Sequence, residues 1–244
     1  MNGVPYVSVI IPAYYSYRTI EACLQALRIQ RFRDFETIVV NSSPEDRTQE
    51  IMTERFPEVI FEQSPTRLFP HAARNRGATL AHGRLLVSTD PDCVANPSWL
   101  ACLVDRHQAG YPVVGGSMDV VDGNWFEYGI HLCKFFWALP GLSPGSRWIL
   151  PTANLCYSRE VWNAVGPMDT CFVGDAVFSW RAVAQGYLPW FEPNAVVKHH
   201  HDGTMGSFWH ERLSRGHEFA EVRMVFERWS RLRATLYLFI WPLL

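Results

Sequence analysis

Apolar and polar positions from the N-terminus to Thr89 follow two alternating periods, one typical of strands and one of helices. Runs rich in branched apolar residues, from Val7 to Ile11, Glu36 to Val40 and Leu85 to Thr89, are typical of strands buried on both faces of a parallel sheet. Segments with helical spacing and one shorter strand separate these runs: helices at Thr19 to Gln30, Thr48 to Phe56 and Phe69 to Ala81, and a strand at Val59 to Glu62. This order predicts an α/β fold whose mostly parallel sheet is flanked by helices.

The regular alternation stops after about residue 110, and the second half of the chain has a mixed pattern. We expect strands at Val113 and Val114, at Asn154 to Tyr157 and just before His199, and helices at Trp125 to Leu139, Arg159 to Val165 and Ala176 to Gln185. The helix from Trp125 to Leu139 is apolar on nearly every side, with a narrow polar stripe of Glu127, His131 and Lys134. A helix this apolar is expected to be buried in the domain, in a partner or at a bilayer.

Composition narrows the function classes. The net charge of -2 provides no basic field for nucleic acid, and 19% charged residues exclude a disordered chain. Aromatic residues make up 14% of the chain, including ten Trp, which favours contact with sugars or with a membrane. The six cysteines are scattered without a CxxC pair, so we expect free thiols and a reducing compartment.

Polar residues follow the ends of the predicted parallel strands, where open α/β sheets bind their ligands. Pro12 and Tyr14 follow the first strand, Asn41 ends the second, and Asp90 and Asp92 follow the strand ending at Thr89. No glycine-rich phosphate loop is present, so a metal is the natural partner for a diphosphate. Two carboxylates at this spacing suit Mn2+ or Mg2+, although Asp-Pro-Asp is also common in turns.

Five segments resemble successive motifs of the family 2 glycosyltransferases, in the family's order and over roughly residues 5 to 220. They are VSVIIPAYY, ETIVVNSSPEDRT, AARNRGATLAHGRLLVSTDPDC, TANLCYSREVWNAVGPMD and VGDAVFSWRAVAQGY. The resemblance implies a GT-A, Rossmann-like fold. It also implies transfer of a sugar from a nucleotide-diphosphate donor to a hydroxyl acceptor, with inversion at the anomeric carbon and with Mn2+ or Mg2+ as cofactor.

The resemblance also implies roles for individual residues. Asp175 matches the catalytic base, with the cap of the following helix as the alternative. His199 matches a metal ligand beside Asp92, with a polar surface loop as the alternative. The donor-binding residues would be Pro12, Tyr14, Asn41, Arg74, Asp90 and Asp92, and the acceptor side would include Asn154, Trp180 and Arg181.

Three departures from the family pattern qualify these roles. Asn41-Ser42 stands where the family usually has Asp-Asp, which leaves the nucleotide base open, while Asp46 keeps its place in the motif. Gly174 stands where the family has Glu before the catalytic Asp. No QxxRW motif is present, which argues against a processive polysaccharide synthase. The alternative function is therefore a catalytically inactive homologue that binds a nucleotide sugar.

The expected domain organisation is a GT-A domain over residues 1–206, followed by a membrane-associating helical segment over 207–244. Within the first, residues 5–116 would bind the nucleotide sugar and 117–206 the acceptor. Six arginines lie on the expected C-terminal amphipathic helix: Arg212, Arg215, Arg223, Arg228, Arg231 and Arg233. The apolar run from Leu236 to Leu244 is shorter than the ~20 residues that span a bilayer. We therefore expect peripheral contact with the cytoplasmic face of the cell membrane and a glycan or lipid-linked acceptor.

Overall fold

The computed structural model describes residues 3–44, 47–121, 123–171, 173–201, 203–230, 232–233 and 235. The chain divides into two units, the first comprising Met1–Thr170 with Gly174–His201 and the second Cys171–Val173 with Asp202–Leu244. Asp46, Arg231 and the tail from Leu236 to Leu244, which carry sequence predictions, lie outside the described residues.

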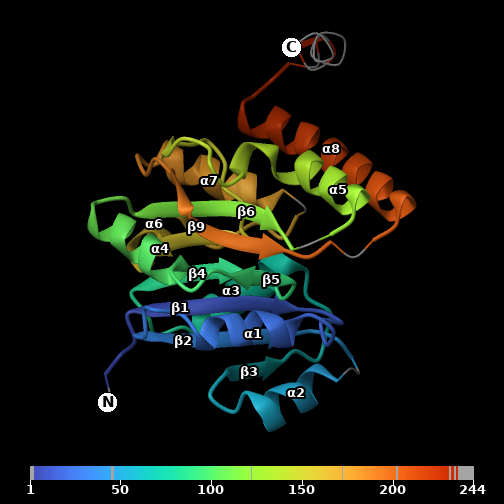
Figure 1. The fold of residues 1–244 in the computed structure, drawn as a ribbon. Coiled ribbons are helices and arrows are strands. Elements are labelled where there is room, and N and C mark those ends of the chain that lie inside the picture. The colour runs from blue at the N-terminus through green and yellow to red at the C-terminus, as the bar shows by residue number, and fades with distance from the viewer. Residues whose placement is uncertain are drawn as a thin grey trace. The chain divides into compact units, whose positions relative to one another are not determined.

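In the described part of the first unit, nine strands form one sheet in the order β3-β2-β1-β4-β8-β6-β9-β5, with β7 paired to β9. The strands are β1 Val7–Ala13, β2 Phe35–Asn41, β3 Ile60–Gln63, β4 Leu85–Thr89, β5 Cys93–Ala95, β6 Val113–Val120, β7 Gly145–Ser146, β8 Asn154–Ser158 and β9 Trp190–His199. The helices are α1 Ile20–Arg28, α2 Thr48–Arg55, α3 Pro70–Leu80, α4 Trp99–Gln108, α5 Trp125–Phe135, the 3-10 turn η1 Phe136–Ala138, α6 Arg159–Val165 and α7 Gly174–Ala184. In Figure 1, α1 and α4 lie in front of the sheet and α3 lies behind it.

The N-terminal half of the sheet is parallel, as its apolar runs predict. β1 pairs in parallel with β2 and with β4, and β2 pairs in parallel with β3. Every residue of β1 and β4 is buried, which is expected of central strands covered on both faces. Pro12 was expected to close the first strand but lies inside β1, opposite Val40. Because pairing with β4 stops at Ile10, the missing N–H of Pro12 interrupts no ladder on that side.

The second half of the sheet is mixed. β8 lies antiparallel between β4 and β6, whereas β9 runs parallel to β6 and carries the antiparallel β5 on its other edge. The predicted parallel first half and mixed second half are therefore both confirmed. β5, β7 and α4 were not predicted from the sequence. The two strands have three and two residues, too short for any periodic signal, and their pairing with β9 defines them.

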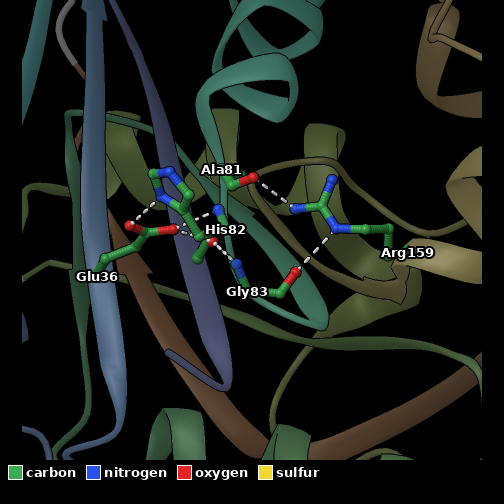
Figure 2. A network of polar contacts seen from close by, with 6 residues as sticks. Glu36, Ala81, His82, Gly83 and Arg159 are labelled. Atoms are coloured by element: carbon green, nitrogen blue, oxygen red, sulfur yellow. Dashed lines mark hydrogen bonds and ion pairs between the residues drawn. The ribbon is translucent and has the colours of Figure 1, made fainter. Parts of the chain in front are cut away.

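A hydrogen-bonded network ties the turn between α3 and β4 to the start of β1 and β2. Glu36 accepts hydrogen bonds from the Ser8 hydroxyl and the His82 backbone N–H, each 2.6 Å long, and pairs with the His82 ring at 3.0 Å. Arg159 donates to the carbonyls of Ala81 and Gly83, as Figure 2 shows. A Cβ on Gly83 would lie 2.6 Å from the Ser8 nitrogen, so this turn requires glycine.

The second unit contains one long helix, α8 Met205–Phe226, which begins with a capping box between Thr204 and Ser207. It ends earlier than the predicted helical stretch, which extended toward the C-terminus. Three of the six arginines lie on α8, where three glutamates balance their charge: Arg212, Arg215 and Arg223 against Glu211, Glu218 and Glu221. Within the described residues, no helix is long and apolar enough to cross a membrane.

Candidate active site

The carboxyl ends of β1 and β2 expose aromatic side chains beside a closed polar network. Tyr14 and Tyr15, directly after β1, are 40% and 48% exposed. The guanidinium of Arg67 lies 4.6 Å from the centre of the Tyr14 ring, a cation–π contact. Tyr15 has a positive φ of 50°, rare for an aromatic residue, and its N–H donates to the Ser43 hydroxyl at 2.6 Å. The expected donor-binding Tyr14 is therefore accessible, whereas Pro12 is buried in β1.

Asn41, the last residue of β2, is buried, and its amide is used inside the protein. Its amide N–H donates to the Gln63 side chain at 2.9 Å, and its oxygen accepts from the Ser43 hydroxyl at 2.9 Å. Gln63 in turn donates to the Ser43 carbonyl at 2.8 Å. This network fixes the loop after β2. It uses both the N–H and the oxygen of the Asn41 amide, a side chain that the sequence analysis assigned to the nucleotide-sugar donor.

Arg74 and Asp90 form an ion pair at the carboxyl end of β4. Arg74 projects from α3 and its side chain is only 2% exposed. The Arg74 Nε is buried and has no hydrogen-bond partner among the described residues. The buried guanidinium of Arg74 holds the partly exposed Asp90 carboxylate in place at the end of this strand. The structure thus brings together two of the six residues that the sequence analysis assigned to the donor.

Asp92, Cys93 and His199 form a cluster whose potential metal-binding atoms lie within 4.8 Å of one another. β5 and β9 create it, because Cys93 and His199 are paired in register. The Asp92 carboxylate lies 3.7 Å from Nε2 of His199. The Asp92 Oδ1 and the His199 Nδ1 are buried and have no hydrogen-bond partner within the described residues. Buried polar atoms are usually paired, so this cluster has spare coordinating capacity.

The oxygen and nitrogen donors of this cluster suit a hard cation. The Asp92 carboxylate is the kind of ligand that Mn2+ and Mg2+ prefer, and the His199 imidazole is a second donor. Without a metal, burial raises the pKa of the Asp92 carboxyl, His199 lowers it, and the neighbouring Asp90 raises it further. Burial also raises the pKa of the Cys93 thiol well above its ordinary value.

Two further buried histidines lie beside His199. His201 stacks on the His199 ring with centroids 4.6 Å apart, and His131 of α5 contacts His201 with facing nitrogens at 3.0 Å. Burial lowers the pKa of His131 and lowers that of His201 to about 3, so both rings are neutral. His199 and His201 lie on one side of the chain because side chains alternate along an extended segment. Sequence reasoning left His131 in the polar stripe of the apolar helix.

Asp175 lies in the first turn of α7 and is half-buried. Its carboxylate accepts a hydrogen bond from the Ala176 N–H at 2.9 Å. α7 begins at Gly174, so Asp175 is inside the helix and not at the cap that the alternative interpretation proposed. The Asp175 carboxylate is only partly buried, so it can approach the hydroxyl of an acceptor, as a general base must.

A scan against protein-family models matches residues 8–173 to the glycosyl transferase family 2 model. The chain belongs to glycosyl transferase family 2. The relation predicted from the five motifs is therefore confirmed. Among curated proteins, glycosyltransferase AglE of Haloferax volcanii is 28% identical over 208 residues, covering 81% of this chain and 68% of AglE. An uncharacterized glycosyltransferase of Nostoc, alr2836, is 28% identical over 199 residues, covering 75% of this chain and 58% of that protein.

Solved structures agree with the GT-A fold. Residues 1–349 of S. aureus TarS, crystallised with UDP-GlcNAc, superpose with a TM-score of 0.66 at 19% identity, covering 90% of this chain and 65% of that one. A longer S. aureus TarS structure gives 0.61 at 19% identity, covering 84% and 38%. This likeness shows the fold, which confirms the α/β GT-A prediction. The chain spans 58% to 68% of the curated family 2 relatives AglE and alr2836.

The departure from the family 2 pattern at Gly174 has a steric reason in this chain. A Cβ at position 174 would collide with the Asp169 carbonyl and lie 2.7 Å from the His71 ring. The imidazole of His71, on α3, thus occupies the space next to Gly174, and its Nδ1 lies 3.5 Å from Arg74. Asp90 therefore contacts Arg74, and Arg74 lies next to His71. The His71 ring in turn lies against Gly174, the residue before Asp175. Sequence reasoning missed His71, because a lone His at the start of a helix carries no motif.

The three residues assigned to the acceptor side differ in their surroundings. Asn154 is fully buried and its amide bonds the Ser117 and Ala195 carbonyls and the Trp99 indole N–H. This amide joins β8 to β6 and β9, so it has no group left for an acceptor. Trp180 is partly exposed, and Arg181 donates to the Pro167 carbonyl and pairs with Asp169 at 3.2 Å. Arg181 thus braces the loop that precedes Asp175.

Proposed function

We propose that this chain is an inverting glycosyltransferase that moves a sugar from a nucleotide-diphosphate sugar to a hydroxyl acceptor, without processive synthesis. The observation that carries the proposal is the pairing of Asp92 and His199, each with a buried polar atom that has no hydrogen-bond partner among the described residues. This pair lies where β4 and β9 end, and α/β enzymes bind nucleotides at the carboxyl ends of such strands.

The chain's residues would divide the work as follows. The exposed Tyr14 ring would contact the base, and Arg74 would hold Asp90 beside the nucleotide. Asp175 would take the proton of the acceptor hydroxyl as the acceptor oxygen bonds the anomeric carbon and the bond to the diphosphate breaks. Asp92 and His199 would hold Mn2+ or Mg2+, which neutralises charge that develops on the leaving diphosphate.

The first donors to test are UDP sugars, because TarS of the similar fold was crystallised with UDP-GlcNAc. The Asn41-Gln63-Ser43 network replaces the usual acidic pair, so the panel should include other nucleotides. A thermal-shift screen ranks donors, since a ligand at 100 times its Kd stabilises by ~2.7 kcal/mol.

Donor turnover separates an enzyme from the alternative, a homologue that only binds nucleotide sugars. We expect release of nucleoside diphosphate from the best donor in the presence of Mn2+ and loss of this activity in EDTA. Binding without release, both in water and with added acceptors, would support the inactive homologue. Release that persists in EDTA would exclude the metal assignment of Asp92 and His199.

The outward face of α5 supports the proposal of a membrane-borne acceptor. The apolar residues Trp125, Tyr128, Leu132 and Phe136 are 45% to 83% exposed and recur every three or four residues, on one side of the helix. The opposite side of the helix buries Ile130 and His131. The helix therefore points its apolar side outward, with aromatic rings at both ends, an arrangement suited to a lipid interface.

Liposome flotation tests this membrane contact. Because α8 carries no net charge, the attraction should come from the apolar face of α5 and persist at high salt, unlike the charge-driven binding expected from the sequence. The double variant Trp125→Ser/Phe136→Ser should lower binding while donor turnover is unchanged. Equal flotation of both proteins would exclude α5 as the membrane contact.

Free thiols fit a location of this protein at the cytoplasmic face of the membrane, where the surroundings are reducing. The free cysteines are Cys23, Cys93, Cys102, Cys133 and Cys156.

A further inference from the structure

The candidate metal ligand His199 lacks the support that a metal-binding histidine normally has. Such a residue usually donates its second ring N–H to a carboxylate, carbonyl or water, which fixes the orientation of the ring. Here Nε2 of His199 faces Asp92 at 3.7 Å, and Nδ1 is buried without a hydrogen-bond partner among the described residues. Among the described residues, no hydrogen bond therefore fixes the orientation of the His199 ring.

Ring stacking takes the place of that hydrogen bond. The His201 ring lies nearly parallel to the His199 ring, with 4.6 Å between centroids and 28° between planes. Phe135 of α5 covers the same ring with centroids 5.4 Å apart. The backbone of His199 is held separately, because its carbonyl accepts from Val121 and the next N–H donates to the Asp92 carbonyl at 2.9 Å.

His201 is itself fixed by a directional chain of hydrogen bonds. His131 Nε2 lies 3.0 Å from the Met118 carbonyl of β6, which can only accept, so this nitrogen carries the proton. The other ring nitrogen of His131, Nδ1, faces Nε2 of His201 at 3.0 Å. A ring that carries its one proton on Nε2 accepts at Nδ1. We therefore expect His201 to donate to His131 and His131 to donate to Met118, with both rings as Nε2–H tautomers.

We propose that His131 and His201 are positioning residues that orient the metal ligand His199, with His131 connecting α5 to the metal site. The inference rests on the proposed function for its metal. It explains why the most buried polar residue of an outwardly apolar helix is a histidine: His131 is 2% exposed. Through the same helix, the apolar face and the metal site share one rigid support.

Binding of Mn2+ alone, measured by the electron paramagnetic resonance signal of the free ion, tests this inference without an activity assay. His131→Leu removes the acceptor for His201 and should weaken Mn2+ binding ~10–100-fold. His131→Asn keeps an oxygen near the place of Nδ1 and should recover most of the loss. Ile130→Ala, at the neighbouring buried position of α5, should lower stability but leave Mn2+ affinity unchanged.

The outcomes separate the inference from the function on which it rests. Wild-type protein that binds no Mn2+ overturns the metal assignment and the inference with it. Wild-type binding that His131→Leu leaves unchanged overturns the inference alone, as does an equal loss in His131→Leu and Ile130→Ala. Imidazole ¹⁵N and ¹³C shifts give a second readout, and Nδ1–H tautomers at His131 or His201 would also overturn it.

Discussion

The edge of the sheet where β1 and β2 begin differs from the edge where β4 and β9 end in how its polar groups are satisfied. At the start of β1 and β2, the groups of Ser8, Glu36, Gly83 and Arg159 bond one another in a closed network (Figure 2). At the opposite edge, four buried polar atoms have no hydrogen-bond partner within the described residues: Arg74 Nε, Thr89 Oγ1, Asp92 Oδ1 and His199 Nδ1. The hydrogen bonds of the first edge hold its strands and turns together, whereas the second edge has the unpartnered groups expected of a ligand-binding site.

From this difference we infer that one edge of the sheet contributes mainly to stability and the other mainly to function. A closed network contributes to the free energy of unfolding, so its loss should lower stability and leave catalysis alone. Unpartnered buried groups cost stability in the free protein and are retained for what they bind. Substitutions at the two edges should therefore have effects of different kinds, and for some residues of opposite sign.

The largest effect is expected at Asp175. Asp175→Asn removes the base but keeps the size of the side chain, so turnover should fall ~10²–10⁴-fold while donor binding is retained. Steady-state kinetics with the best donor and calorimetric donor binding measure the two quantities. Turnover close to that of the wild type would remove Asp175 from the mechanism.

The next largest effect is expected at Asp92. Asp92→Ala should abolish tight Mn2+ binding and weaken the donor, because the carboxylate of the candidate metal pair is lost. In metal-free buffer the same variant should be as stable as the wild type or more stable, since burial raises the pKa of this carboxyl and its charge is costly there. Clear destabilisation of the metal-free variant would show that Asp92 stabilises the fold, as the groups at the opposite edge do, and is not kept for ligand binding.

Much of this molecule was predictable from the sequence because its signals are local. The apolar runs of β1, β2 and β4 and the short α6 were found within two residues of their ends. The family motifs named Arg74, Asp90, Asp92 and His199, and the structure places Arg74 against Asp90 and His199 near Asp92; their roles stay predictions. β5 and the roles of His71 and His131 were not predictable, because each depends on a partner that is distant in sequence and close only in the fold.

At the closed edge, Glu36→Gln should lower the free energy of unfolding by about 1–2 kcal/mol at pH 7. Burial acts to raise the pKa of Glu36, but hydrogen bonds from Ser8 and His82 lower it below its ordinary value of 4.5. A lowered carboxyl pKa stabilises the fold above 4.5, and this contribution is lost as pH falls through the folded pKa. Urea unfolding from pH 7 to about pH 3 should therefore show a constant gap between wild type and variant down to about pH 4.5, and a closing gap below it.

The same substitution at an exposed pair controls for that result. Glu58→Gln removes a carboxylate that pairs with Arg28 while 54% exposed, so it should change stability little. Donor turnover should match the wild type in both variants. A loss of turnover in Glu36→Gln at full folding would connect the closed edge to catalysis, contrary to the separation proposed above.

The smallest effect is expected at Thr89, and its sign distinguishes the edges. Thr89 is the last residue of β4, 1% exposed, and its hydroxyl has no hydrogen-bond partner in the described residues. Val has nearly the same shape without the hydroxyl, so Thr89→Val should raise the free energy of unfolding by about 1 kcal/mol and Tm by ~2–4 °C. If the hydroxyl serves the ligand, donor affinity should fall in the same variant. Thermal unfolding with and without donor measures both quantities. A Thr89→Val variant less stable than the wild type would show that the Thr89 hydroxyl is hydrogen-bonded within the fold, as the Ser8 hydroxyl is at the opposite edge.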